Sequence, residues 1–295
     1  QYYTLVSEFM LQQTQVKIVI PYFNRFIKNI PDLETLANYN NQKLIKLWEG
    51  LGYYSRVRNL KKASKVIIND FNKKLPSKFL ELKSLPGIGD YTASAISAIA
   101  FNKPLIPLDG NVERVLKRYL NLKKEKQIQK ENLIEKKKIF GTSIRSSDYA
   151  QALMELGALI CKPSNPLCNK CPISRNCKSF IKKDFVLTKI KKKNKNKYFL
   201  LKVYKKNNKY LLVKNIKFNF LKNFNIFPMH ELIKPKNFTQ NINFKMSNMN
   251  MNIKIEYNNV IKSIPLSYWI DPKKLKNYTL PSFTKKIVRY LENNK

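Results

Sequence analysis

The stretch LPGIGDYTA, residues 85–93, decides the fold of the first half of this chain. It lies between segments 76–84 and 90–101, whose apolar residues recur at helical spacing. Gly87 and Gly89 let the backbone turn tightly, and the amides that open the next helix can bind an anion such as a phosphate group. Because an ordinary turn between helices has the same composition, the stretch by itself predicts a helical hairpin and no particular activity.

The helical pattern extends over most of the sequence to about residue 180. Leu5 and Phe9 are spaced with Val16 and Ile20 as on one face of a helix, and Pro21 follows where we expect that helix to end. Further helical patterns cover 41–49, 55–70, 76–84, 90–101, 110–120, 129–139 and 147–161. The first half of the chain is therefore predicted to be mostly α.

The second half has a different pattern. Residues 181–197 consist largely of Lys and Asn and are too highly charged to pack, which predicts a linker. Apolar residues then alternate or cluster as in strands at 198–204, 210–213 and 249–257. A closing helix is predicted over 283–291. We therefore expect a mostly α domain over 1–180 and an α+β domain over 198–295.

The charge of the chain favours a polyanionic partner. Lys and Arg outnumber Asp and Glu 57 to 19, and the net charge of +38 is spread along the whole length. An A/T-rich coding bias would also enrich Lys and Asn, so the charge alone does not identify nucleic acid. No apolar run approaches the length of a membrane span and no signal-peptide pattern opens the chain, so we expect a cytoplasmic protein without a membrane partner.

All four cysteines lie close together in the sequence. They follow the pattern C-x6-C-x2-C-x5-C at Cys161, Cys168, Cys171 and Cys177. This spacing is too local for a disulfide framework and is typical of metal ligation. Four thiolates without a histidine suit an iron-sulfur cluster, and a structural zinc site is the alternative.

Five motifs resemble, in order over residues 1 to about 178, the adenine DNA glycosylase family of the helix-hairpin-helix superfamily. They are SEFMLQQTQV (7–16), GLGYYSR (50–56), the hairpin (85–93), LDGNV (108–112) and ALMELGA (152–158). The cysteine spacing is similar to that of the [4Fe-4S] ligands in this superfamily. The resemblance implies a helix-hairpin-helix glycosylase domain with an iron-sulfur loop at 161–177.

The activity that the resemblance implies is base-excision repair. Such an enzyme hydrolyses the N-glycosidic bond of adenine mispaired with 8-oxoguanine or guanine in double-stranded DNA and leaves an abasic site. We expect a monomer that acts on the bacterial nucleoid.

Two carboxylates carry the chemistry in this interpretation. Cleaving the bond to adenine requires an acid that protonates the leaving base and a carboxylate that steadies the sugar cation. The resemblance implies that Glu8 is the acid, and its apolar neighbours should raise its pKa. It implies that Asp109 steadies the sugar. Outside these motifs, Glu8 would be read as a solvated helical residue and Asp109 as a helix N-cap.

Tyr91 distinguishes two kinds of glycosylase. In glycosylase-lyases similar to endonuclease III, the resemblance places a lysine at this position, and its amine attacks the sugar to form a Schiff base. A phenol cannot form one. Tyr91 therefore predicts a monofunctional enzyme that uses water.

The DNA-contact residues follow from the same motifs. Base flipping leaves a gap that side chains fill, and Gln13 and Tyr53 match the intercalating positions of the family. Asn111 and Glu155 match residues that line the adenine pocket. Without the motifs, these would be ordinary surface or core residues.

The C-terminal half resembles, more faintly, the Nudix-like domain with which the family recognises 8-oxoguanine. Phe227-Pro228 and residues 278–282 match its landmarks, and the Nudix hydrolase box is absent from the sequence. Ser247 matches the serine of a recognition loop that is usually Phe-Ser-His, here Met246-Ser247-Asn248. We expect His230 to be structural.

Two other interpretations stay open at this point. One is a bifunctional pyrimidine glycosylase and lyase, which Tyr91 and the second domain disfavour. The other is a DNA-binding protein that has lost catalysis, which the altered loop at Ser247 favours and the retention of Glu8 and Asp109 disfavours.

Overall fold

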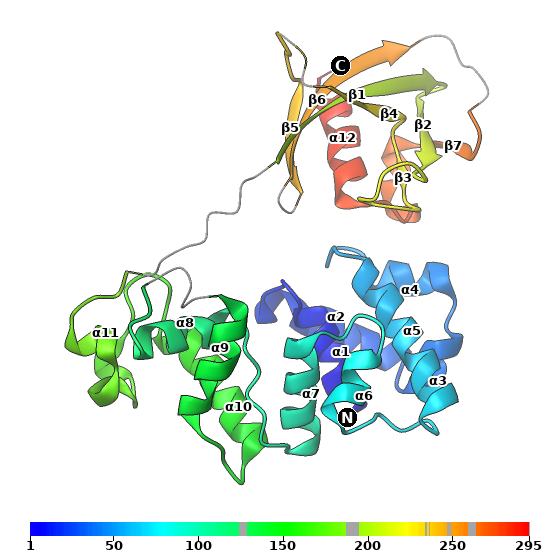
Figure 1. Ribbon diagram of the computed structural model, residues 1–295. Helices are drawn as coiled ribbons and strands as arrows, with labels where there is room; N and C mark the ends of the chain where they lie inside the picture. The colour runs from blue at the N-terminus through cyan, green and yellow to red at the C-terminus, as the bar shows by residue number, and fades with distance from the viewer. Residues whose placement is uncertain are drawn as a thin grey trace. The chain divides into compact units, whose positions relative to one another are not determined.

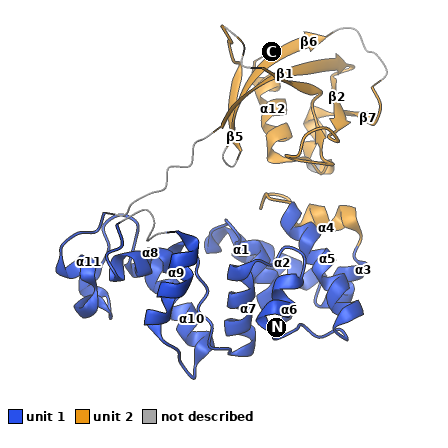
Figure 2. Ribbon diagram, in the orientation of Figure 1, with its two compact units in different colours: residues 1–39, 55–190 blue, residues 40–54, 191–295 orange. Residues whose placement is uncertain are grey.

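The computed structural model describes residues 1–123, 129–186, 195–233, 235, 237–246, 249–258 and 264–294. The chain forms two compact units (Figure 2). Unit 1 comprises residues 1–39 and 55–190, and unit 2 comprises residues 40–54 and 191–295. Residues 40–54, which the predicted helical domain included, thus group with the C-terminal half.

Unit 1 is helical throughout its described part (Figure 1). Its helices are α1 (Tyr2–Leu11), α2 (Val16–Asn29), α3 (Leu33–Asn38), α5 (Ser55–Asp70), α6 (Phe79–Ser84), α7 (Asp90–Phe101), α8 (Gly110–Tyr119), α9 (Lys130–Lys136), α10 (Ser146–Glu155) and α11 (Lys178–Ile181). Shorter turns are η2 (Lys137–Phe140), the π turn η3 (Leu156–Ile160), η4 (Cys168–Lys170) and η5 (Ser174–Asn176). The predictions for 55–70 and 90–101 are confirmed by α5 and α7.

The expectation that one helix contains Leu5, Phe9, Val16 and Ile20 and ends at Pro21 is wrong. The chain breaks at 12–15, where Gln13 has a φ of +58°, and α2 then runs through Pro21 to Asn29. The interior proline costs α2 one backbone hydrogen bond, a loss that a helix with tertiary contacts tolerates. Val16 is 62% exposed and Ile20 is 53% exposed, so the apolar spacing did not mark a core face.

Helix α7 lies at the centre of unit 1. Every residue from Thr92 to Ala98 is buried, and α7 packs against α1, α6 and α10. Small Ala and Ser side chains in this stretch allow neighbouring helices to approach closely. The hairpin between α6 and α7 is therefore fixed to the most buried helix of the unit.

Unit 2 contains helix α4 (Asn41–Leu47) and a sheet covered by one long helix, α12 (Ser282–Asn293) (Figure 1). Strand order is β3-β2-β1-β6-β5, with β4 also pairing with β1 and β7 with β2. The strands are β1 (Lys195–Lys206), β2 (Lys209–Lys214), β3 (Asn225–Ile226), β4 (Met229–Leu232), β5 (Ile242–Met246), β6 (Met249–Asn258) and β7 (Ser267–Ile270), and the turn η6 (Pro272–Asn277) precedes α12.

Alternation along the two central strands builds the core of unit 2. β1 and β6 run parallel, with Phe199 opposite Ile253, and side chains on the same face are buried against α12. The second half is therefore an α+β domain with a mixed sheet, as predicted. β1 begins at Lys195, so it includes the last residues of the stretch predicted as a linker; residues 187–194 lie outside the described part of the chain.

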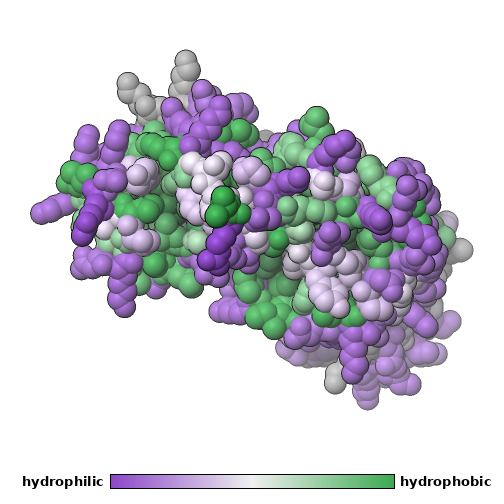
Figure 3. Space-filling view, turned by 90° about the horizontal axis from the view of Figure 1, so that it is seen from below, coloured by the Kyte–Doolittle hydropathy of each residue, from purple (hydrophilic) through white to green (hydrophobic). Residues whose placement is uncertain are grey.

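The surface is rich in polar side chains. Figure 3 shows one face of the molecule, on which hydrophilic side chains, drawn in purple, project beside smaller apolar areas in green. None of the helices in the described ranges combines the length and the apolar character that crossing a lipid bilayer requires.

Candidate active site and cysteine cavity

Glu8 lies on the buried face of α1. Its side chain is 2% exposed, among the buried residues Leu5, Val6, Phe9 and Met10 of the same helix. Burial raises its pKa to about 7, the negative charge of Asp109 adds to the rise, and a contact with the Tyr91 hydroxyl opposes it. Its Oε2 atom is buried and has no hydrogen-bond partner within the described residues. Glu8 is thus an acid that holds its proton near neutral pH.

The C-terminal end of α1 is fixed by a residue distant in sequence. Arg56 of α5 is 5% exposed, and its Nη1 donates to the carbonyls of Phe9 at 3.1 Å, Met10 at 2.6 Å and Gln12 at 2.7 Å. Gln12 in turn donates to the Gly87 carbonyl at 3.3 Å. The helix that carries Glu8 is therefore attached directly to the hairpin.

Tyr91 is the second residue of α7, so the hairpin sets its position. Burial raises the pKa of its hydroxyl well above the usual range, and the charges of Glu8 and Asp109 add to the rise. Three separate elements therefore bring Glu8, Tyr91 and Asp109 within electrostatic reach of one another.

Asp109 is the N-cap of α8, and its carboxylate is held at both oxygens. Oδ1 accepts the backbone N–H of Asn111 at 3.0 Å and of Val112 at 2.7 Å, while Oδ2 accepts the side-chain amide of Asn111 at 3.0 Å. Burial raises its pKa, and these hydrogen bonds and Arg114 oppose the rise. The capping role and the proposed catalytic role thus fall on the same side chain.

The two hairpin glycines have different structural demands. Gly87 has a φ of +83°, and a Cβ there would lie 2.7 Å from Asn59 Cβ and 2.9 Å from the Phe9 ring. Gly89 has a φ of −98° and no neighbour within 4 Å of a Cβ position. As the N-cap of α7 it offers no side chain to the first backbone amides of that helix. Close packing and the positive φ therefore require a glycine at position 87. Gly89 leaves the first backbone amides of α7 open to approach.

Arg114 connects the carboxylate to the cysteines. Its Nη2 donates to Asn111 Oδ1 at 2.9 Å and to the Gly157 carbonyl at 2.6 Å, and its Nε donates to the Cys161 carbonyl at 2.7 Å. Gly157 is needed for this approach, because a Cβ there would lie 2.7 Å from Asn111 Cβ. A chain of hydrogen bonds therefore links the Asp109 carboxylate, through Asn111 and Arg114, to the backbone carbonyl of Cys161.

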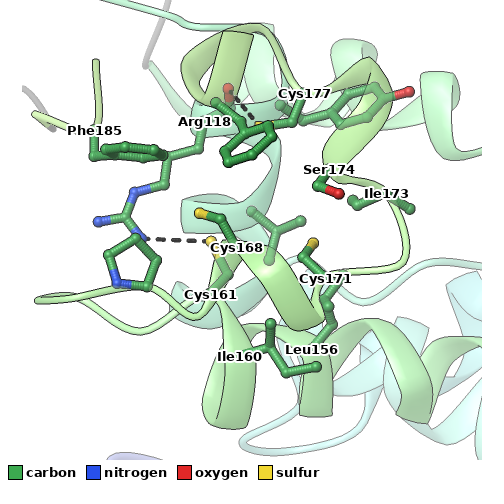
Figure 4. Close-up of a pocket in the computed structure, with 14 residues that line it drawn as sticks. Arg118, Leu156, Ile160, Cys161, Cys168, Cys171, Ile173, Ser174, Cys177 and Phe185 are labelled. Carbon is green, nitrogen blue, oxygen red and sulfur yellow. Dashed lines mark hydrogen bonds between the residues drawn. The ribbon is translucent and has the colours of Figure 1, made fainter. Parts of the chain in front are cut away.

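All four cysteines line a single cavity in unit 1 (Figure 4). The cavity contains about 400 Å³ of empty space, with the open solvent at its mouth included. Its other walls are mainly apolar, among them Leu156, Ile160 and Ile173. Within the described ranges, no group of three or more His, Cys, Asp or Glu side chains has the arrangement required to hold a metal ion. The four thiols surround a space instead.

Arg118 is the charged residue of this cavity. It is 4% exposed, and its Nη1 donates to Cys161 Sγ at 3.4 Å, which Figure 4 marks with a dashed line. Burial raises the pKa of the Cys168 and Cys171 thiols, nearby cysteines add to the rise, and Arg118 opposes it at Cys168. At Cys168 and Cys171, burial and the neighbouring cysteines therefore favour the neutral thiol.

The remaining predicted contact residues lie in several places. Gln13 is exposed in unit 1, in the break between α1 and α2, and Tyr53 is 46% exposed in unit 2 with a φ of +45°. Glu155 ends α10 and is exposed. Ser247 lies outside the described residues.

Sequence reasoning missed three arginines, Arg56, Arg114 and Arg118. Their roles depend on carbonyl and sulfur atoms that are more than 40 residues away in sequence. The one local signal was the i, i+4 spacing of Arg114 and Arg118 on α8, which places both on one face of the helix.

The class of protein follows from the fold and from a family match. Residues 6–138 match the HhH-GPD superfamily of base excision DNA repair proteins. A solved thermostable thymine-DNA glycosylase has a TM-score of 0.54 and 26% identity over 61% of this chain and 84% of that chain. A non-covalent complex of endonuclease III with DNA, with a TM-score of 0.53 and 23% identity over 61% of this chain and 84% of that one, has the same fold.

Curated relatives narrow the class to one family. The adenine DNA glycosylase of Buchnera aphidicola subsp. Baizongia pistaciae is 40% identical over 70% of this chain and 60% of its own length. That of Buchnera aphidicola subsp. Schizaphis graminum is 37% identical over 77% and 67%, and the human enzyme is 38% identical over 60% and 33%. The chain belongs to the adenine DNA glycosylase family, which confirms the resemblance inferred from the motifs. It spans about 60 to 67% of the two bacterial relatives' lengths.

Proposed function

We propose that this protein is a monofunctional adenine DNA glycosylase that hydrolyses the N-glycosidic bond of adenine opposite 8-oxoguanine or guanine. The observation that carries the proposal is the buried Glu8, whose pKa is raised to about 7 by burial and by the nearby Asp109. Two carboxyl groups in different environments are the arrangement that this bond cleavage requires. The names of the curated relatives support adenine as the base.

Glu8 is the proton donor in this proposal. Adenine is a poor leaving group until a ring nitrogen is protonated, and an acid with a pKa near 7 is both protonated often enough and acidic enough to do so. The burial of the Glu8 side chain keeps water from the carboxyl group. No second acid is required.

Asp109 then stabilises the positive charge that develops on the sugar. The Asn111 side chain and two backbone amides hold its oxygens in fixed directions, so the carboxylate does not reorganise during the reaction. Because Tyr91 provides no amine, water completes the reaction and the product is an abasic site.

DNA docking is assigned to the hairpin. The open backbone around Gly89 leaves the first amides of α7 available to a phosphate. We assign Gln13, Tyr53 and Glu155 to the mispair and the flipped base by their motif positions alone. The protein is proposed to act as a monomer on double-stranded DNA at the nucleoid, in the bacterial cytoplasm.

The cysteine cavity is assigned to a [4Fe-4S] cluster. Four thiols and no histidine form the donor set, they surround a space, and the buried Arg118 Nε has no hydrogen-bond partner in the described part of the chain. An anionic group held by Cys161, Cys168, Cys171 and Cys177 would compensate this buried cation. When bound, the cluster would serve a structural role and hold the 161–177 loop in place.

Residues 198–295 of unit 2 are proposed to form a Nudix-like domain that recognises 8-oxoguanine in the opposite strand. Its mixed sheet with a covering helix suits that assignment. Ser247 is assigned to this recognition by its motif position alone. We expect it to contribute to discrimination and not to bond cleavage.

A single-turnover assay tests the proposal. Duplexes containing A:8-oxoguanine, A:G or T:G are incubated with excess protein, and abasic sites are revealed by alkali. We expect adenine release from the first two and none of thymine. Strand cleavage without alkali, or equal release from T:G, would contradict a monofunctional adenine glycosylase.

Matched variants separate chemistry from folding. Glu8→Gln should lower the rate by about 10² to 10⁴-fold, because the amide has no acidic proton. Glu34→Gln makes the same change in an exposed ion pair with Lys73 on the surface, and should behave as the parent. Equal rates for Glu8→Gln and Glu34→Gln would rule out Glu8 as the acid.

A further inference from the structure

The buried guanidinium of Arg118 is a charge for which the described chain provides no carboxylate. Its hydrogen bonds go to two backbone carbonyls, Lys162 at 2.6 Å and Pro163 at 2.8 Å, and to Cys161 Sγ at 3.4 Å. Its Nε hydrogen has no partner among the described residues. A buried cation without an anion is costly, so the location favours an anionic neighbour.

Among the residues that line the described cavity, the four cysteines are the side chains that can become negatively charged. Arg118 lines the same cavity as all four thiols, and Cys177 Sγ also lies 3.5 Å from the Arg118 carbonyl oxygen. Thiols that ligate a metal are deprotonated. Four thiolates carry more negative charge than the iron-sulfur core neutralises, so a bound cluster would be anionic beside Arg118.

We propose that Arg118 is the positioning residue that helps Cys161 to retain a [4Fe-4S] cluster and that it raises the reduction potential of the cluster. The inference rests on the cluster assigned to the cysteine cavity above. One guanidinium performs two tasks, since its N–H···S bond and charge stabilise the Cys161 thiolate while its two carbonyl contacts fix the chain that follows Cys161.

Arg114 does not duplicate this role. It lies one helical turn before Arg118 on α8, but its contact with Cys161 is to the carbonyl oxygen and not to the sulfur. Its other donors hold Gly157 and Asn111. Of the two arginines, Arg118 is therefore the one that donates a hydrogen bond to the Cys161 sulfur.

Iron release provides the first test, with the adjacent lysine as control. Arg118→Gln and Lys117→Gln remove the same charge from neighbouring positions, and Lys117 pairs with Glu113 at 3.1 Å and does not line the cavity. We expect Arg118→Gln to release iron to a chelator about 10- to 100-fold faster than the parent, the usual cost of losing a residue that supports a metal ligand. Lys117→Gln should match the parent.

Voltammetry of the purified, iron-loaded proteins provides the second test. A nearby cation favours the more reduced, more negative cluster, so Arg118→Gln should have a lower reduction potential than both the parent and Lys117→Gln. A residue that merely braced the loop would leave the potential unchanged. Equal iron release or equal potentials in Arg118→Gln and Lys117→Gln would overturn the inference.

Arg118→Lys keeps the test decisive if Arg118→Gln does not fold. The ammonium retains the charge but cannot bind one sulfur and two carbonyls as the planar fork does. We expect a potential close to that of the parent and faster iron release. A potential as low as in a charge-free variant such as Arg118→Met would contradict the role of charge. A parent that binds zinc and no iron would overturn the cluster itself, whereas an iron-loaded parent insensitive to Arg118 overturns this inference alone.

Discussion

Asn111 donates to both oxygens of Asp109, through its backbone N–H to Oδ1 at 3.0 Å and through its side-chain amide to Oδ2 at 3.0 Å. The same side chain accepts from Arg114 at 2.9 Å. One amide therefore fixes the rotation of the carboxylate and joins it to the network that reaches Cys161.

Replacing this amide should reduce base release without unfolding the chain. Asn111→Ala keeps the backbone cap but removes the bond to Oδ2, and a hydrogen bond to a charged group is worth about 1.5–3 kcal/mol. If the bond acts fully in the transition state, adenine release in single turnover should fall about 10- to 100-fold. Circular dichroism and iron content should match the parent. An unchanged rate would show that Asp109 needs no such support.

The rate of base release should decrease at high pH with the pKa of Glu8. The acid must be protonated to act, and its pKa is raised to about 7, so the second-order rate should be high below pH 7 and fall about tenfold per pH unit above it. Tyr91→Phe removes the hydroxyl that lowers this pKa, so the decrease should move to higher pH. A decrease at the same pH in Tyr91→Phe would mean that the hydroxyl does not act on Glu8.

Glu8 should lower the free energy of unfolding of the protein at neutral pH. Its folded pKa is about 7 and its ordinary value is 4.5, so the folded state loses stability as the pH rises from 4.5 to 7. Above pH 7 the loss approaches about 3.5 kcal/mol, since one pKa unit corresponds to about 1.4 kcal/mol. The free energy of unfolding of Glu8→Gln, measured in urea, should therefore increase relative to that of the parent as the pH rises from 4 to 8. A difference independent of pH would contradict the raised pKa.

Tyr91→Lys should introduce a reaction that the parent lacks. An amine at the start of α7 can attack the sugar and form a Schiff base, which borohydride traps as a covalent protein–DNA adduct. We expect trapping by Tyr91→Lys and none by the parent or by Tyr91→Phe. Strong trapping by the unmodified protein would show that another amine attacks the sugar.

Gly87→Ala and Gly89→Ala form a matched pair in one turn. At Gly87 the positive φ and the contacts with Asn59 and Phe9 should cost at least about 2 kcal/mol in the free energy of unfolding. At Gly89 no strain or clash arises, so stability should change by less than about 0.5 kcal/mol. DNA affinity should nevertheless fall in Gly89→Ala, because the methyl group obstructs the amides. If Gly89→Ala binds DNA as tightly as the parent, the hairpin does not contact DNA as proposed.

The sequence predicted most helix bounds because amphipathic spacing and helix caps are local signals. Asp109 opens α8 and the apolar spacing gives α5 and α7. Pro21 misled the prediction, since tertiary contacts allow α2 to continue through it. The short strands β3, β4 and β7 carry too few residues for alternation to show.

The sequence predicted which residues form the candidate site, but not the interactions between them. The motifs selected Glu8, Tyr91 and Asp109, and the structure adds their mutual electrostatic influence. The arginines escaped because their partners are main-chain carbonyls, which the sequence letters do not display. The roles of Gln13, Tyr53 and Ser247 stay predictions, because they depend on bound DNA.

Arg56 links the end of α1, the helix that contains Glu8, to α5. Helix α1 has no basic residue in its own last turn, and the carbonyls at its end are satisfied by an arginine 44 to 47 residues away in sequence. During synthesis, a nascent chain that ends before α5 therefore leaves this helix end open to water. We therefore expect α1, and Glu8 with it, to reach its final position together with α5.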